Sequence, residues 1–418
     1  MKIFEPKLFS TLRGYTARDV LGDVVAGIIV AIIALPLSIA LAIASGAEPA
    51  TGLYTAIIAG FLTSMLGGSK VNISGPTAAF ATIVAGIILG HGMDGLVLAT
   101  IMAGIILVIM GVCRLGSLIK YIPHTITVGF TSGIAVTLFV GQMKDFLGLK
   151  YPAGAHAIET IEKLKLVFEN ISTINVWSIA VGVLALVILI VLPKIFKKVP
   201  PSLIAVVVGA LIVALAPIGV DTVGSLYIVQ SGLPSVTIPS ISLDRILTLL
   251  PSAITIALLA SIESLLSCVV SDKMIDDTHN PNTELIALGI GNSVTAIFGG
   301  IPATGAIART AANVKNGAKS PLSGMTHAIV LLLVLVVLMP YASMIPMPVI
   351  ASILFVVAYN MSEYKQFFGI IKSKKLEDIV VLVVTFVLTV VFDLVVAIAV
   401  GMAIHYLILL IKKLSRKQ

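Results

Sequence analysis

The sequence predicts an all-α membrane protein that crosses the bilayer many times, as one transporter domain covering residues 1–418. Of these residues, 58% are hydrophobic and only 11% are charged, which excludes a soluble domain and a disordered chain. A helix needs roughly 20 apolar residues to span the membrane. Apolar runs of about this length follow one another along the chain with short links. Two of them are broken by glycine and proline at corresponding positions of the two halves, as in transporters with an inverted repeat.

The apolar runs divide into fourteen transmembrane segments, seven in each half. In the first half we expect spans over about 24–45, 52–66, 70–89, 94–112, 123–140, 177–196 and 202–218. In the second half we expect them over about 249–270, 283–298, 302–314, 322–339, 346–359, 378–391 and 394–411. An odd number per half gives the second half the opposite orientation, which makes a 7+7 inverted repeat. The amphipathic stretch between residues 144 and 175 is expected on the surface.

The basic residues indicate the orientation in the membrane. With the N-terminus in the cytoplasm, most of the 27 lysines and arginines fall in cytoplasmic links, as the positive-inside rule requires. Those on the outer side are Lys144, Lys150, Lys163, Lys165 and Arg245. We therefore expect a multi-pass protein of the cell's inner (plasma) membrane, with both termini cytoplasmic and no nucleic-acid partner. The N-terminal residues do not read as a cleaved signal peptide.

Segments 3 and 10 are predicted to be half-helices, each preceded by a short strand. Residues 67–80 read GGSKVNISGPTAAF, and residues 299–310 read GGIPATGAIART. Non-helical backbone at membrane depth is tolerated only inside protein or beside a water-filled cavity. If the two segments enter from opposite faces, their N-termini meet near the midplane. Free backbone N–H groups and the positive dipole ends then attract an anion to one spot.

The predicted substrate site lies between these N-termini, where small side chains let a ligand approach the backbone. An intramembrane arginine marks a functional site, and its fork suits oxyanions. A serine after the proline kink of the first span could also line the cavity. The candidate substrate-binding residues are Ser38, Gly75, Pro76, Thr77, Ala78, Gly305, Ala306, Ile307, Ala308 and Arg309. The alternatives are tight helix packing for the small residues, and a structural pair with Glu263 or snorkelling for the arginine.

Glu263 is the only acidic residue in the eighth span, and Ser267 lies one turn on, on the same face. A lone intramembrane carboxylate is a proton site, a cation site or a counter-charge. We interpret Glu263 and Ser267 as the coupling-ion site for a proton or sodium, with Gly305 as a further sodium contact. The alternative is a static salt bridge. We find no other metal site, no phosphate loop and no catalytic motif, so we expect no cofactor and no enzymatic activity.

Three runs in order resemble the SulP, or sulfate permease, family. They are NPNTELIALGIGN at 280–292, GGIPATGAIART at 299–310 and NGAKSPLSG at 316–324. The ALPLSIALAIASG of the first span and the residues up to 79 are similar to the family's first signature. The resemblance covers essentially the whole chain. It implies the 7+7 inverted repeat, a core domain (about 20–112 and 249–339) moving against a gate domain (about 113–218 and 342–412), and usually a homodimer.

Residue by residue, Arg309 matches the family's arginine of half-helix 10. Ala306 and Ala308 stand where some members have serines. Glu263 and Ser267 match the acid and hydroxyl that help to hold sodium in a sodium-coupled bicarbonate member.

Two features depart from the family pattern. Leu37 follows the helix 1 proline where many members have Gln or Glu, so coupling at that position is absent. The family usually adds a C-terminal STAS domain; because the sequence stops at Gln418, we expect the membrane domain alone.

The sequence therefore predicts a secondary active transporter of small anions that works by elevator-like alternating access and is coupled to a proton or sodium. A sulfate-type inorganic anion is favoured, while bicarbonate and dicarboxylates stay open. The alternatives are an uncoupled anion exchanger or channel, and a nucleobase-type carrier on the same fold. A nucleobase carrier would need carboxylates to hydrogen-bond the base, and an arginine argues against it.

Overall fold

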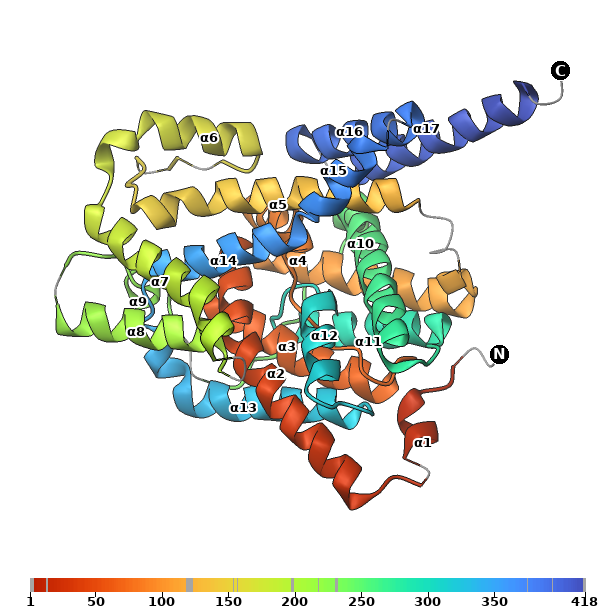
Figure 1. The fold of residues 1–418 in the computed structure, drawn as a ribbon, viewed down its shortest axis with the longest axis horizontal. Helices are drawn as coiled ribbons and strands as arrows, with labels where there is room; N and C mark the ends of the chain where they lie inside the picture. Colours follow the sequence, from red (N-terminus) through yellow and green to blue (C-terminus); the bar gives the residue numbers. More distant parts are fainter. Residues whose placement is uncertain are drawn as a thin grey trace.

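The computed structural model describes residues 4–12, 14–117, 123–152, 154–155, 157–196, 199–216, 218–229, 232–373, 375–392 and 394–415. These residues are mostly helical and contain a single two-stranded sheet. Figure 1 shows α2, α3 and α13 on one side of the molecule and α5, α15, α16 and α17 on the other.

The first half begins with a short helix and then follows the predicted spans. Its elements are α1 (Lys7–Thr11), α2 (Ala17–Ala44), α3 (Pro49–Leu66), β1 (Ser74–Gly75), η1 (Ala78–Phe80), α4 (Ala81–Val112), α5 (His124–Leu147), α6 (Thr160–Glu169), η3 (Ile171–Thr173), α7 (Val176–Ile195) and α8 (Pro201–Leu215). Predicted segments 3 and 4 are the two parts of α4, because Gly92 has a φ of 67° and interrupts the helix there. A positive φ of this kind strongly favours glycine.

The second half repeats the plan. Its elements are α9 (Val223–Leu226), α10 (Leu243–Ile275), α11 (Pro281–Ile297), β2 (Thr304–Gly305), α12 (Ile307–Lys315), α13 (Leu322–Ala342), α14 (Met347–Met361), α15 (Tyr364–Lys372), α16 (Leu376–Val391) and α17 (Leu394–Ser415). The fourteen segments of the inverted repeat are thereby confirmed. Among the described residues, 8 helices are long and apolar enough to cross a membrane by themselves, and α8 is a shorter apolar helix.

Helix ends follow polar caps more closely than hydropathy. We expected the first span to begin near residue 24, but α2 starts at Ala17 because Thr16 and Asp19 form a capping box. Likewise α10 starts at Leu243, where the Ser242 side chain accepts the backbone N–H of Arg245. Both helices therefore extend beyond their apolar stretches.

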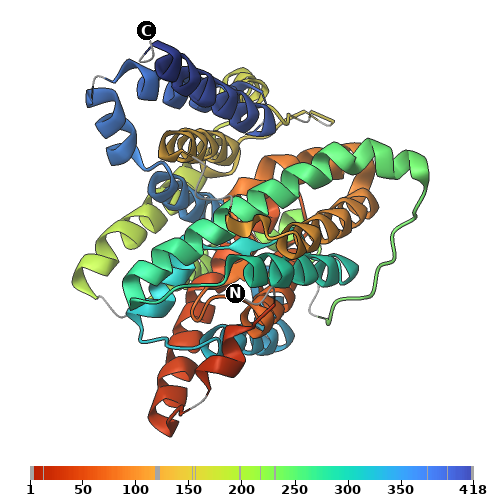
Figure 2. The same ribbon diagram turned by 90° about the vertical axis from the view of Figure 1, so that its right-hand side faces the viewer.

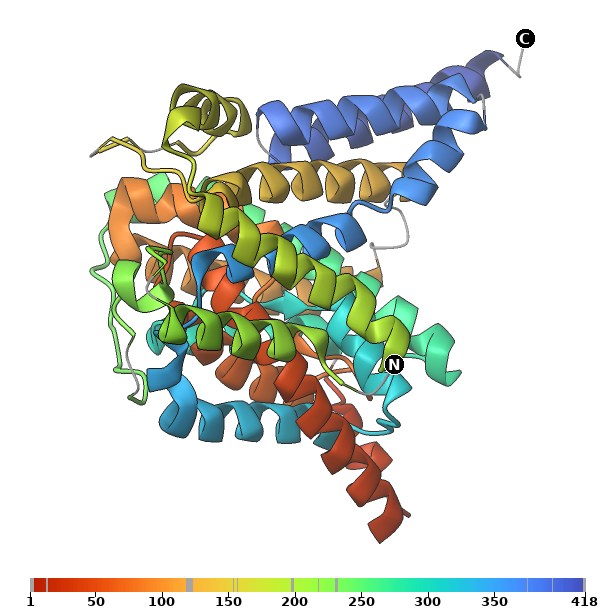
Figure 3. The same cartoon turned by 60° about the vertical axis from the view of Figure 1, so that its left-hand side comes forward.

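The two largest apolar clusters among the described residues each combine helices of both halves. In one of them α13 packs on α2 and α3, and in the other α11 and α10 pack on α4. Helices α14 and α16 pack on α5, and α7 packs on α14, while residues of α5 and α14 also join the cluster of α2, α3 and α13. Figures 2 and 3 show α16 and α17 standing off from the helices that surround α12.

Strands β1 and β2 join the two halves at their broken segments. They pair antiparallel, with Ser74 opposite Gly305 and Gly75 opposite Thr304. The expected strands are confirmed in type and place, although each is only two residues long. Helices η1 and α12 begin directly after their strands, so this small sheet brings the two half-helix N-termini together.

Candidate functional site

The candidate site is the junction where the two half-helices begin. The backbone N–H of Ala306 donates to the carbonyl of Ile73 at 2.8 Å, which extends the β1–β2 pairing by one bond. The antiparallel register sets Ser74 opposite Gly305, so the chain leaves the sheet in opposite directions towards η1 and α12, and Arg309 of α12 reaches back to Pro76. The structure thus brings the two predicted sets of substrate-binding residues to one place.

Arg309 crosses this junction from α12 to segment 3. Its side chain is buried, with 2% exposed, and Nη2 donates to the carbonyl of Pro76. Within the described part of the chain, Nε and Nη1 have no hydrogen-bond partner. Buried donors left unpaired cost free energy, so these two N–H-bearing atoms lack a partner that the described residues could supply. Gly75 makes room for the guanidinium, because a Cβ at that position would overlap Nη1.

Glu263 faces segment 3 from α10. Its carboxylate accepts a hydrogen bond from the Thr77 hydroxyl at 2.9 Å. Among the described residues, no ion pair within 4.0 Å joins Glu263 to Arg309. The carboxylate and the guanidinium therefore contact neighbouring residues of segment 3, Thr77 and Pro76, rather than each other.

Ser267, the expected partner of Glu263, lies in a different polar cluster. Its buried hydroxyl donates to Asn72 Oδ1 at 2.7 Å and lies 3.1 Å from Thr310 Oγ1. Gly305 borders the same cluster, since a Cβ there would lie 2.7 Å from Asn72 Nδ2. Among the described residues, the hydrogen bonds of the Ser267 hydroxyl go to Asn72 and Thr310 and none goes to Glu263, and a shared cation site stays a prediction.

Three other expected substrate contacts differ in their exposure. Ile307 is 41% exposed and Ala308 is exposed, so one flank of α12 is open beside Arg309. Ser38 is completely buried, and its hydroxyl has no partner among the residues that the structure describes. It lies at the contact between α2 and α3, where a Cβ on Gly52 would overlap its carbonyl oxygen.

Comparison with known proteins agrees with this architecture. The model of the sulfate permease family matches residues 20–385. The putative sulfate transporter YvdB of Bacillus subtilis is 44% identical over 96% of this chain and 76% of YvdB. The bicarbonate transporter BicA of a Picosynechococcus species is 32% identical over 96% of this chain and 72% of BicA. The solved transmembrane domain of a cyanobacterial BicA superposes with a TM-score of 0.82 at 30% identity, covering 92% of this chain and 98% of that domain.

The chain belongs to the sulfate permease family. It is a multi-pass membrane transporter and not an enzyme, and it shares the fourteen-segment fold. Among its described residues, no group of 3 or more His, Cys, Asp and Glu side chains could hold a metal ion.

The third family motif, residues 316–324, holds the C-terminal end of half-helix 10 (α12) in place. The buried carboxylate of Asp23 on α2 accepts the backbone N–H groups of Lys319 at 2.7 Å and Ser320 at 3.2 Å. It also accepts the hydroxyls of Tyr15 and Ser320. These bonds anchor the loop after α12 to the first span.

Sequence reasoning missed Asn72 and Glu284. Glu284 stands in the motif that begins α11 and is buried, with 2% exposed. We placed it in the first turn of a span, where an acidic residue commonly stabilises the helix N-terminus. The signal that could have singled it out is the apolar run directly after it, Leu285 to Leu288, which buries that turn.

Proposed function

We propose that this chain is a secondary active transporter of small anions, with a sulfate-type inorganic anion as the favoured substrate and bicarbonate or dicarboxylates as others. The observation that carries the proposal is a buried arginine, Arg309, with two nitrogens that have no hydrogen-bond partner among the described residues, at the junction of two half-helix N-termini. A fixed positive charge and two converging helix dipoles favour an oxyanion there. The names of YvdB and BicA support the same class of substrate.

The coupling ion in this proposal binds at Glu263 and is a proton or sodium. An ionised carboxylate beside the junction repels an incoming anion. A proton or sodium on Glu263 cancels that charge, so the cation and the anion favour each other's binding by the same factor. The hydrogen bond from Thr77 to Glu263 supports this link, because Thr77 also belongs to the anion junction.

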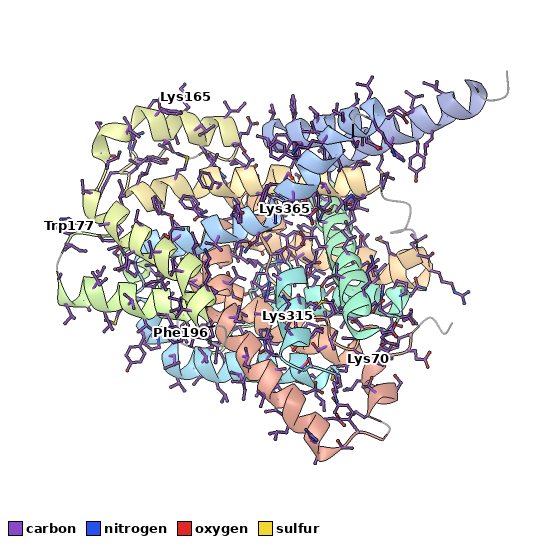
Figure 4. The ribbon with its side chains drawn as sticks, in the orientation of Figure 1. Lys70, Lys165, Trp177, Phe196, Lys315 and Lys365 are labelled. Atoms are coloured by element: carbon purple, nitrogen blue, oxygen red, sulfur yellow. The ribbon has the colours of Figure 1, made fainter. Side chains whose placement is uncertain are left out.

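Alternating access would come from an elevator movement of the core (about 20–112 and 249–339) against the gate (about 113–218 and 342–412). The packing of α13 on α2 and α3, and of α14 and α16 on α5, supports this division. We place the protein in the cell's inner membrane as a homodimer with cytoplasmic termini. Trp177 and Phe196, 57% and 56% exposed at the two ends of α7, support a lipid-facing helix whose aromatic residues lie at the interfaces (Figure 4).

The test is radiolabelled uptake into proteoliposomes, with sulfate, bicarbonate and fumarate in parallel and with imposed proton or sodium gradients. We expect one gradient to drive uptake of one anion, and Glu263→Gln to abolish the effect of the gradient. Uptake that ignores both gradients would reject coupling and favour exchange. Ionic current far above carrier turnover would indicate a channel, and competition by a nucleobase would reject the anion assignment.

A further inference from the structure

Glu284 is a second buried carboxylate close to the site, and neutral donors surround it. It accepts the backbone N–H of Gly68 at 2.9 Å, Asn72 Nδ2 at 2.7 Å and the Ser264 hydroxyl at 3.4 Å. In the described part of the chain, no basic nitrogen lies within 4.0 Å of it. A buried charge is costly unless it is hydrogen-bonded, so these donors are what stabilises it.

Asn72 links this carboxylate to half-helix 10. Its Oδ1 accepts the hydroxyls of Ser267 at 2.7 Å and Thr310 at 3.0 Å, while its Nδ2 faces Glu284. Thr310 in turn accepts the backbone N–H of Ile73 at 3.0 Å. Asn72 therefore accepts hydrogen bonds from α10 and α12 and donates to a carboxylate, which can only accept.

This network holds the neighbours of the site's two charged residues. Thr310 directly follows Arg309, and Ser264 directly follows Glu263. The short strand β1 lies between Asn72 and Pro76, whose carbonyl accepts a hydrogen bond from Arg309. The hydrogen bonds of one amide thus reach α10, α11 and α12.

We propose that Asn72 and Glu284 are positioning residues that set Arg309 and Glu263 against segment 3 for anion binding. Neither would touch the anion. The proposal rests on the anion transport proposed above. It predicts that the donor and acceptor pattern matters at this joint, and not merely the presence of two polar side chains.

Three variants distinguish the effect of the donor and acceptor pattern from the effect of having two polar side chains at these positions. Glu284→Gln gives the carboxylate position an N–H₂ group, which faces either Asn72 Nδ2 or the Gly68 N–H, so one donor meets another. Asn72→Asp sets two carboxylates against each other at 2.7 Å. The double variant N72D/E284Q restores each pair, because the new amide donates to Asp and accepts from Gly68. A matched control is Ser352→Ala on α14, which loses buried hydrogen bonds to Gly182 and Pro348 far from this joint.

The readouts are the KM and maximal rate of anion uptake, and the unfolding temperature of each purified variant without anion. We expect each single variant to raise KM about tenfold or more, ~1.4 kcal/mol per tenfold, at an unchanged maximal rate per folded protein. The double variant should recover KM to within about threefold, ~0.6 kcal/mol. Ser352→Ala should lower the unfolding temperature and leave KM unchanged.

Two results would overturn the proposal. One is a double variant as impaired in KM as Glu284→Gln, because the restored pairs would then have no effect. The other is single variants that lower the unfolding temperature with wild-type KM, because the joint would then stabilise only the fold. If the wild-type chain takes up none of the anions, the proposed function fails. Additive unfolding temperatures across the four proteins would then also reject the pairing of Asn72 with Glu284.

Discussion

At the scale of single residues, the site depends on how Arg309 is held. One nitrogen is fixed on the Pro76 carbonyl, while Nε and Nη1 have no partner within the described residues. The arginine is thus oriented by segment 3 while it belongs to segment 10. This arrangement links the two half-helices through a buried side chain that has hydrogen-bonding capacity left over within the described residues.

Arg309→Ala should weaken anion binding while the protein still folds. A hydrogen bond to a charged group contributes about 1.5–3 kcal/mol, so KM should rise at least tenfold, ~1.4 kcal/mol per tenfold. Arg309→Lys keeps the charge without the planar fork and should recover part of the affinity. Uptake at sub-saturating anion measures both variants, and wild-type uptake by Arg309→Ala would remove this residue from the mechanism.

Gly75→Ala should displace the guanidinium without changing any charge. The added methyl overlaps Arg309 Nη1, and overpacking of this kind costs about 1–3 kcal/mol. We expect a higher KM together with a lower unfolding temperature. Gly90→Ala is the matched control, since a Cβ there meets nothing within 4 Å. Equal KM values for the two variants would show that the space at Gly75 is not needed for Arg309.

At the scale of elements, the broken segments are the parts of the fold that the sequence predicted best. Gly-Pro and Gly-Gly pairs inside apolar runs are rare enough to mark segments 3 and 10, and the structure places both where we expected them. The partners of Ser267 were not predictable. Its place one turn from Glu263 indicated a shared site, but Asn72 approaches from segment 3 and accepts its hydrogen bond.

Gly92 tests the division of α4 into two segments. Its φ of 67° and ψ of −176° fall in a region that is essentially restricted to glycine, and placing another residue there costs roughly 1–3 kcal/mol. Gly92→Ala should therefore lower the unfolding temperature while KM stays as in the wild type, because Gly92 lies at the far end of the half-helix. An unchanged unfolding temperature would contradict the observed break.

At the scale of the whole molecule, the proposed movement requires looser packing between core and gate than inside either one. A cavity of about 320 Å³ lies there, and it is lined by residues of α4 and α10 on one side and of α5, α6 and α16 on the other. Ala79, next to the expected substrate contact Ala78, lines its inner part. The cavity is therefore the place where a bulky side chain should impede movement without touching the anion.

Gly86→Trp should slow transport through this cavity. Gly86 lines it, and a Cβ there meets nothing within 4 Å, so the indole can enter without disturbing α4. Conformational steps commonly limit turnover, and we expect the maximal rate to fall about tenfold with KM nearly unchanged, ~1.4 kcal/mol in the barrier. Gly90→Trp on the exposed flank of α4 is the control. Equal rates for the two variants would place the movement elsewhere.

Asp277 should make stability depend on acid pH. It pairs with Lys70 at 3.1 Å and Lys7 at 3.4 Å. Burial raises the pKa of Asp277. The hydrogen bond from the Thr278 backbone and the two lysines together lower it by more, so the pKa lies below its ordinary value. This stabilisation is complete above the unfolded pKa of about 3.9 and is lost as pH falls through the lower, folded value.

Thermal unfolding of wild type and Asp277→Asn between pH 7 and pH 3 measures this effect. The difference between the two should be at most about 1 kcal/mol, the range of solvent-accessible pairs, and it should shrink as the pH falls below about 4. A difference that grows towards acid pH would contradict the lowered pKa.

The sequence by itself determined the membrane class, the fourteen segments, the two half-helices and the candidate arginine, because hydropathy, helix breakers and a lone intramembrane charge are local features. Only the tertiary structure decided which side chains meet. It bound Arg309 to Pro76 and Glu263 to Thr77, and it joined Asn72 to both Ser267 and Glu284. These contacts join residues far apart in the chain, and they depend on the register of a two-residue sheet, which no local pattern encodes.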